Sequence, residues 1–259
     1  MKKAAIIVGA SSGIGEQTAY KLADIAEKET LDKIFLIARR KDLLENVARK
    51  VDSIAGRPLS AVCCGDITDN NFLEKISSGT EGEFEVSWLI NSAGCGFYGN
   101  VDKVSAEKSC LCTELNCTSA VRVTAHFLPY INKGGHIIEM ASSAAFFPQP
   151  GFAVYAASKA FVLSFSRALR RELKPRKISV TAVCPGPCET EFLKLANGGK
   201  EIPAYKRRFM TSPVNVAEKA IKAALKGKEI CFPTFPMRLL YLASKVIPAS
   251  WVMFFQSKL

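Results

Sequence analysis

Short, uninterrupted apolar runs alternate with longer amphipathic stretches along most of this chain. Strands that are apolar throughout are typical of parallel sheets, because helices cover such sheets on both faces. We expect strands at residues 4–9, 33–38, 59–64, 86–91, 136–141, 177–184 and 229–232, and helices at about 13–27, 42–54, 69–77, 105–131, 152–173 and 214–226. Strict alternation of this kind predicts an α/β fold with a doubly wound, seven-stranded parallel sheet, the Rossmann fold.

The length of the chain favours one large domain followed by a distinct tail. With 259 residues, of which 48% are hydrophobic, the chain can bury a sizeable core and is not disordered. We predict a single domain over residues 1–234, because no repeat or linker interrupts it. Residues 235–259 lack acidic residues and are rich in large apolar ones. They predict a cap over a pocket, a subunit interface, or a basic apolar surface that contacts a membrane.

Charge and composition narrow the range of partners. A net charge of +11 would suit an anionic ligand, a membrane surface or nucleic acid. The basic residues are scattered and no nucleic-acid-binding motif accompanies them, so we expect no nucleic-acid partner. With nine cysteines but no C-x-x-C pair, and only two histidines, we expect no metal site and reduced thiols in a cytoplasmic protein. The short apolar N-terminus is interpreted as a first strand rather than a signal peptide.

A glycine-rich turn follows the first apolar run. It has the sequence Gly9-Ala10-Ser11-Ser12-Gly13-Ile14-Gly15. Glycines at a strand-to-helix junction let a pyrophosphate approach the backbone, and the helix N-terminus supplies free N–H groups and a positive dipole. The spacing differs from the more general G-x-G-x-x-G motif, and an ordinary tight turn is the alternative. Its position in an alternating α/β chain favours dinucleotide binding.

The end of the second expected strand indicates which dinucleotide binds. An acidic residue there would bind the ribose 2′-hydroxyl of NAD, but Arg39 and Arg40 stand at this point. Two guanidinium groups suit a 2′-phosphate, so the sequence predicts NADP(H) as the cofactor. A solvated arginine pair at a helix start is the alternative. Further candidate cofactor contacts follow the third and fourth strands, at Asp66, Ile67, Asn91, Ala93 and Gly94.

Ser142, Tyr155 and Lys159 are candidate proton-transfer residues. Tyr155 and Lys159 are four residues apart in an expected helix and therefore share one face. Ser142 lies at the end of an expected strand. A phenol has an ordinary pKa of about 10, and a nearby ammonium group lowers it. The three side chains could therefore protonate a carbonyl oxygen or deprotonate an alcohol, although such a Tyr–Lys pair alone is more often a solvated helix face.

These motifs together resemble those of the classical short-chain dehydrogenase/reductase family. The resemblance extends from about residue 3 to residue 232. The matching features, in the family's order, are the glycine turn, Asp66, the N-x-A-G segment at Asn91, Asn116, Ser142, the Tyr155/Lys159 pair, Pro185-Gly186 and Thr190. Two positions differ from the usual pattern: Val8 replaces a threonine and Ser92 an asparagine. Both are structural positions.

The resemblance implies an oxidoreductase that interconverts a ketone and a secondary alcohol with NADP(H). Tyr155 would be the general acid–base, and Lys159 would lower its pKa and hold the nicotinamide ribose. Ser142 would orient the substrate carbonyl, and Asn116 would support a water chain to Lys159. The remaining implied cofactor contacts are Pro185, Gly186 and Thr190, the last to the nicotinamide carboxamide. A homodimer or homotetramer is also implied.

The expected pocket walls favour a bulky apolar substrate, such as a steroid or a lipid-like compound. The walls include residues 95–98, residues 146–149 and the loop and helices over residues 188–210, which together are rich in aromatic and aliphatic side chains. The candidate substrate contacts are Ser142, Cys95, Phe147, Gln149 and Tyr155. The same residues could instead simply pack a lid. A β-ketoacyl thioester reductase and a non-catalytic NADP-binding sensor or scaffold remain as alternatives. We expect the protein in the cytoplasm, with membrane association through residues 235–259 left open.

Overall fold

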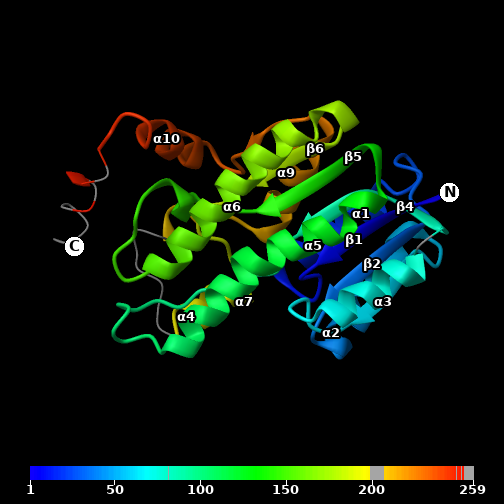
Figure 1. Ribbon diagram of the computed structural model, residues 1–259, viewed down its shortest axis with the longest axis horizontal. Helices are drawn as coiled ribbons and strands as arrows, with labels where there is room; N and C mark the ends of the chain where they lie inside the picture. Colours follow the sequence, from blue (N-terminus) through cyan, green and yellow to red (C-terminus); the bar gives the residue numbers. More distant parts are fainter. Residues whose placement is uncertain (81, 199–206, 249, 252, 254–259) are drawn as a thin grey trace.

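Seven parallel strands form one sheet at the centre of the protein. The computed structural model describes residues 1–80, 82–198, 207–248, 250–251 and 253 (Figure 1). The strands are β1 Lys2–Val8, β2 Lys33–Ala38, β3 Ser60–Cys64, β4 Phe84–Asn91, β5 Ile131–Met140, β6 Ser179–Val183 and β7 Ile230–Cys231. Their order in the sheet is β3-β2-β1-β4-β5-β6-β7. The predicted doubly wound, seven-stranded parallel sheet is thereby confirmed.

Helices cover both faces of this sheet. They are α1 Gly13–Asp24, α2 Lys41–Ala55, α3 Asn70–Thr80, α4 Ala106–Thr113, α5 Ser119–Phe127, α6 Ala153–Glu172, α7 Glu191–Ala196, α9 Pro213–Leu225 and α10 Phe235–Ala243. Successive residues of β1 face opposite layers, as a strand requires. Ala5 and Ile7 pack in a core with α1, α2 and α9, whereas Ile6 and Val8 pack in a core with α3, α5 and α6. Burial on both faces explains why the strands are apolar throughout.

The single helix expected over residues 105–131 is divided in the structure. A π-helical turn, η1 Glu114–Thr118, separates α4 from α5, and a short 3-10 turn, η2 Leu128–Tyr130, follows. π-Helical turns insert one extra residue into a helix and occur often at functional sites. Pro129 lies within the first two positions of η2, where its missing N–H costs no helical hydrogen bond. Strand β5 then begins at Ile131, before the expected start at residue 136.

The C-terminal helix α10 packs beside the carboxyl end of β5. The Tyr241 ring lies 5.2 Å from the Phe146 ring of the 3-10 turn η3 Ser143–Phe146. Met237 is buried, whereas Phe235 and Leu242 are 67% and 52% exposed. Figure 1 shows α10 at the end of the molecule opposite the N-terminus. Among the described residues, no helix combines the length and the apolar character needed to cross a bilayer.

Candidate active site

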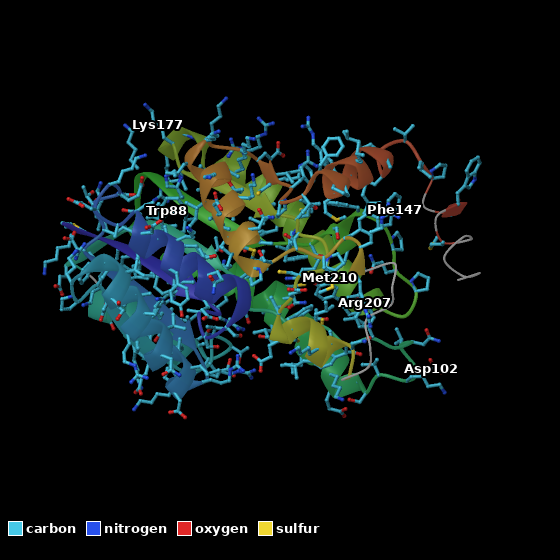
Figure 2. The ribbon with its side chains drawn as sticks, turned by 180° about the vertical axis from the view of Figure 1, so that it is seen from behind. Trp88, Asp102, Phe147, Lys177, Arg207 and Met210 are labelled. Atoms are coloured by element: carbon cyan, nitrogen blue, oxygen red, sulfur yellow. The ribbon has the colours of Figure 1, made fainter. Side chains whose placement is uncertain are left out.

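A cavity of about 480 Å³ lies at the carboxyl ends of the strands. Val8 at the end of β1 and Met140 at the end of β5 both line it. The chain reverses its direction of travel across the sheet between β1 and β4, and ligands of open α/β sheets bind at such a switch point. Figure 2 shows Trp88, at the core of the sheet, well away from Phe147 near the α10 end.

The glycine turn forms one wall of the cavity. Its three glycines are favoured either by close packing against the backbone or by a positive φ. Gly9 has a φ of +80°, and a Cβ there would lie 2.6 Å from the backbone nitrogen of Ala93. A Cβ on Gly15 would lie 2.2 Å from the carbonyl oxygen of Gly9. Gly13 has a φ of +62°, which also favours glycine. This packing presses the turn against the end of β4.

The N-terminus of α1 opens into the same cavity. Ser12 occupies the N-cap position, but its side chain makes no cap hydrogen bond to α1. Gly13 and Ile14, the first residues of the helix, line the cavity. The N–H groups of a helix's first turn have no partner within the helix. They can therefore bind an anion such as a pyrophosphate.

Arg39 and Arg40 stand at the mouth of the cavity with different partners. Nη1 of Arg40 lies 2.7 Å from both carboxylate oxygens of Glu191 on α7. Nη2 of Arg40 donates to Ser12 at 2.9 Å and to Ser11 at 3.3 Å. Arg39 is 65% exposed and has Nη1 4.0 Å from Oδ2 of Asp66. The guanidinium of Arg39 is thus the more open of the two.

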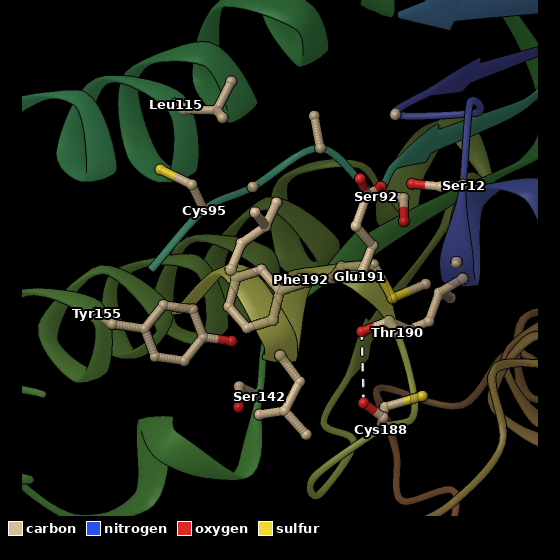
Figure 3. Close-up of a pocket in the computed structure, with 18 of the residues that line it drawn as sticks. Ser12, Ser92, Cys95, Leu115, Ser142, Tyr155, Cys188, Thr190, Glu191 and Phe192 are labelled. Carbon is tan, nitrogen blue, oxygen red and sulfur yellow. Dashed lines mark hydrogen bonds between the residues drawn. The ribbon is translucent and has the colours of Figure 1, made fainter. Parts of the chain in front are cut away.

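The side chains of Ser142 and Tyr155 both line the cavity. Ser142 follows β5 and caps η3 by accepting from the backbone N–H of Ala144 at 3.1 Å. Tyr155 and Lys159 lie one turn apart on α6, and Nζ of Lys159 donates to the carbonyl of Met140 at 2.8 Å. Figure 3 shows the Tyr155 and Ser142 side chains on the same side of the pocket. The structure therefore brings the three predicted residues together.

Burial dominates the protonation of these groups. It raises the pKa of Tyr155, and the nearby Ser142 hydroxyl opposes that rise. Burial also lowers the pKa of Lys159, since the charged form of each group loses hydration. Nζ of Lys159 lies 5.8 Å from the centroid of the Tyr155 ring. That Lys159 lowers the pKa of Tyr155 stays a prediction.

Asn116 lies in the π-helical turn and holds the segment after β4. Its Oδ1 accepts from the backbone N–H of Cys95 at 2.9 Å, and its Nδ2 donates to the Cys95 carbonyl at 2.8 Å and to Ser158 at 2.9 Å. A Cβ on Gly94 would lie 2.8 Å from that Oδ1 and 3.4 Å from Nζ of Lys159. Asn116 and Lys159 thus both lie beside Gly94, and Asn116 also fixes the backbone at Cys95; its predicted water chain to Lys159 stays a prediction.

Aromatic rings form the wall of the cavity around Tyr155. The ring of Tyr98 stacks on that of Phe152 at 3.9 Å, and Phe152 stacks on Tyr155 at 4.3 Å. Phe192 of α7 lies 5.4 Å from Tyr155, close to its ring in Figure 3. Cys95 and Gln149 also line the cavity. This part of the cavity is apolar, with a few polar groups around the Tyr155 hydroxyl.

Most of the predicted site residues line the cavity, and four do not. Those that do are Gly9, Ser11, Ser12, Gly13, Ile14, Arg39, Arg40, Asp66, Ile67, Ala93, Gly94, Cys95, Ser142, Gln149, Tyr155, Lys159, Pro185, Gly186 and Thr190. Gly15 packs beneath the turn, and Phe147 is buried outside the cavity. The amide of Asn91 is turned toward Thr124 and Glu139, and Asn116 contacts Cys95. These four residues therefore lie outside the lining of the large cavity.

Glu191 and Phe192 of α7 lie in the predicted wall at residues 188–210 and line the cavity, but the sequence indicated no individual role for either; residues 199–206 of that wall lie outside the described residues. Glu191 is 151 residues from its partner Arg40, so no local pattern indicates the pair. The nearest residue with a predicted role is Thr190, a predicted cofactor contact. Its hydroxyl donates to the Cys188 carbonyl at 3.3 Å (Figure 3). Within the described ranges, no group of three or more His, Cys, Asp or Glu side chains is placed to hold a metal ion.

Comparisons with known proteins agree with this geometry. A family model described as short chain dehydrogenase matches residues 3–201. A serine 3-dehydrogenase of Agrobacterium fabrum is 32% identical over 199 residues, which cover 76% of each chain. The human 17-beta-hydroxysteroid dehydrogenase type 3 is 30% identical over 202 residues, or 74% of this chain and 61% of that one. The structure of a short-chain dehydrogenase from Sphingobium yanoikuyae in complex with NADPH is 25% identical, with a TM-score of 0.78, over 100% of this chain and 94% of that chain.

Proposed function

This chain belongs to the short-chain dehydrogenase family, and we propose that it is an NADP(H)-dependent oxidoreductase that interconverts a bulky, apolar ketone and its secondary alcohol. The observation that carries the proposal is that Ser142, Tyr155 and Lys159 line the same cavity as the glycine turn. A proton donor thus stands opposite a site built for a dinucleotide.

The residues around the cavity fit NADP(H). The glycine turn and the uncapped N-terminus of α1 would hold the pyrophosphate. Arg39, with its open guanidinium, would bind the 2′-phosphate, and Asp66 would lie near the adenine. The nicotinamide end would reach Thr190 and the Pro185-Gly186 segment, which line the cavity at the base of α7. The bound cofactor supplies or accepts the hydride.

The side chains of the chain itself handle the proton. Burial keeps the Tyr155 phenol protonated at neutral pH, so it can donate to a carbonyl oxygen. The Ser142 hydroxyl can bind the same oxygen, and it stabilises the phenolate that is left. Lys159 donates a hydrogen bond to the Met140 carbonyl. It lies one helical turn from Tyr155 on α6 and can return a proton to the Tyr155 phenolate. In the reverse direction Tyr155 would accept the proton of an alcohol.

The aromatic wall supports a bulky apolar substrate. Tyr98, Phe152 and Phe192 surround the Tyr155 ring and would cover an apolar skeleton of the steroid or keto-lipid kind. The relative that acts on hydroxysteroids favours the same class. The relative that acts on serine makes a small polar hydroxy acid the main competitor, and a β-ketoacyl thioester is a further one.

A substrate panel with matched variants tests this proposal. NADPH and NADH oxidation would be followed with steroid ketones, keto lipids, a β-ketoacyl thioester and, in reverse, L-serine. We expect NADPH-dependent turnover of an apolar ketone, which Tyr155→Phe abolishes without loss of NADPH binding. Tyr20→Phe, on α1 outside the cavity, is the control. Turnover that survives in Tyr155→Phe contradicts the acid–base assignment, whereas tight NADPH binding without turnover of any compound favours the sensor reading.

Peripheral membrane contact through the C-terminal segment is the second candidate property. Five large apolar side chains there are at least half exposed: Phe235, Leu239, Leu242, Val246 and Trp251. No acidic residue follows Glu229, while Arg238 and Lys245 are basic. An anionic bilayer complements such a surface. Because α10 packs on Gly186 and η3, this surface adjoins the cavity, where an apolar substrate could enter.

Vesicle binding tests the membrane contact. We expect the full chain to sediment with anionic vesicles and Leu239→Glu/Leu242→Glu to remain largely in solution. Leu225→Glu on α9 is the control, since Leu225 is 42% exposed and lies away from α10. If Leu239→Glu/Leu242→Glu sediments with the vesicles as much as the control Leu225→Glu does, membrane contact through this segment is contradicted. Cytoplasmic location and the division at residue 234 stay predictions.

We also propose a homo-oligomer that forms through the helices carrying Asn116 and Tyr155. Leu111 on α4 and Phe161 on α6 are 42% and 44% exposed, and a second copy of the chain would cover them. Light scattering coupled to size-exclusion chromatography should show a dimer or tetramer that Phe161→Glu dissociates. A monomeric wild-type chain would contradict this assembly.

A further inference from the structure

A carboxyl group is buried beneath the cavity with one oxygen unsatisfied. Glu139 lies on β5 and is 1% exposed. Its Oε1 accepts from Nδ2 of Asn91 at 2.7 Å and from Oγ1 of Thr124 at 2.9 Å. Its Oε2 and the Oδ1 of Asn91 are both buried without a hydrogen-bond partner among the described residues. Buried polar atoms nearly always have partners, so these two oxygens require an explanation.

A small cavity is lined by both Asn91 and Glu139. It has about 10 Å³ of space for the centre of a water molecule, which is enough for roughly one water. Asn91, Glu139, Asn116, Ser119 and Lys159 are among the residues that line it. Water with two to four polar partners is stable in such a place. Lys159 lines both this cavity and the large one, so it stands between them.

The groups that face Glu139 include one cation. On the sheet its neighbours in register are Asn91 of β4 and Ala182 of β6, and α5 presents Thr124. From α6, the ammonium group of Lys159 acts on the carboxyl. Lys159 itself faces the thiols of Cys95, Cys112 and Cys117.

Burial brings the proton affinities of the two groups toward each other. It raises the pKa of Glu139 to about 7, against the hydrogen bonds from Asn91 and Thr124 and the charge of Lys159. It lowers the pKa of Lys159. Proton transfer between the two groups therefore costs less free energy than it would between the same groups in water.

We propose that Glu139 is a positioning residue for proton transfer, whose Oε2 and the Oδ1 of Asn91 hold a water molecule that links the carboxyl to Lys159. During ketone reduction the Tyr155 hydroxyl gives its proton to the carbonyl oxygen, and the Lys159 ammonium reprotonates the phenolate. The O–H bond on Oε2 of Glu139 then breaks, and its proton passes through the water to the Lys159 amine. The resulting carboxylate regains a proton from solvent before the next turnover. The proposal rests on the proposed function, because it supplies protons to that reaction.

Glu139→Gln tests the proposal with little change in shape. The glutamine oxygen still accepts from Asn91 and Thr124, but the side chain no longer titrates. Thr124→Val is the matched control, since it removes a hydrogen bond to the same carboxyl and leaves the proton in place. We expect the wild-type kcat for ketone reduction to fall as the pH rises through neutrality. In Glu139→Gln that inflection should be absent and kcat at neutral pH about tenfold lower, a smaller loss than that of a direct acid. Thr124→Val should keep the inflection.

An infrared titration of the protein without substrate separates this proposal from the proposed function. The carbonyl band of a protonated carboxylic acid should disappear from the wild-type spectrum as the pH rises through neutrality, and it should be missing from Glu139→Gln throughout. If no ketone is reduced, the proposed function fails while this band still reports on the proton site. An identical kcat profile in wild type and Glu139→Gln, or identical infrared spectra, overturns the assignment.

Discussion

The two ends of the large cavity are built in different ways. At the cofactor end, backbone packs against backbone: Gly9 leaves no room for a Cβ beside Ala93, and Gly15 leaves none beside Gly9. At the end around Tyr155, which we propose binds the substrate and call the substrate end, side chains from distant segments meet, as when Phe192 of α7 faces Tyr155 of α6. A backbone-built site tolerates few substitutions and can hold one ligand shape. A side-chain-built site can change its specificity without a change of fold.

The largest effect should follow from filling the backbone contact at the cofactor end. Gly9→Ala places a Cβ 2.6 Å from a backbone nitrogen at a φ of +80°, so we expect a stability loss of about 3 kcal/mol and no measurable NADPH binding. Denaturant unfolding and fluorescence titration measure the two effects. Gly56→Ala is the control, because Gly56 has a φ of +66° with nothing within 4 Å. Equal losses in both variants would show that strain at positive φ, and not the close packing, is responsible.

Two carboxyl groups should make stability depend on pH in opposite ways: Glu139, which is buried, and Glu191, which is exposed at the mouth of the cavity. The pKa of Glu139 is raised from 4.5 to about 7, so between these values the native state binds more protons than the unfolded state, and stability falls as the pH rises. Glu139→Gln should gain up to about 3 kcal/mol on wild type across this range. Urea unfolding at a series of pH values measures the gain.

The contribution of the exposed carboxyl of Glu191 to stability should change with pH in the opposite direction. Arg40 lowers the pKa of Glu191, so the stability from that pair is lost as the pH falls through the folded-state pKa. Glu191→Gln should therefore differ least from wild type under acidic conditions. A Glu139→Gln difference that does not vary with pH would contradict the raised pKa.

At the substrate end a smaller and more selective effect is expected. Phe192→Ala removes the ring beside Tyr155 and should raise KM for an apolar ketone about tenfold, which is typical of losing one aromatic contact. The affinity for NADPH should not change. Phe192→Leu keeps most of the apolar volume, so its KM should lie between those of the wild type and Phe192→Ala. A loss of NADPH affinity equal to the rise in KM would mean that the ends of the cavity are not independent.

The sequence predicted the two ends of the cavity to different extents, because one is built from local backbone patterns and the other from side chains of distant segments. The expected strand at 33–38 coincides with β2, and the glycine turn was placed correctly, because apolar runs and glycine spacing are local patterns. The ion pair of Arg40 with Glu191 joins residues 151 apart, which no local pattern reveals. Glu139 escaped notice because it lies within the apolar run that predicts β5, and its partners come from β4, α5 and α6.

The ion pair between Arg40 and Glu191 connects the two ends, and breaking it should have the smallest effect. Both side chains are nearly half exposed, at 45% and 44%, so the pair contributes less than about 1 kcal/mol and is screened by salt. Glu191→Gln should free Arg40 for the 2′-phosphate and raise the affinity for NADPH about threefold at low ionic strength. The affinity for NADH, which lacks that phosphate, should stay the same, and the gain should vanish at high salt. Glu189→Gln removes the same charge two residues away without touching Arg40, and it should leave both affinities unchanged. Equal gains for NADPH and NADH in Glu191→Gln would instead indicate that the pair restrains α7, and that the substrate end controls entry of the cofactor.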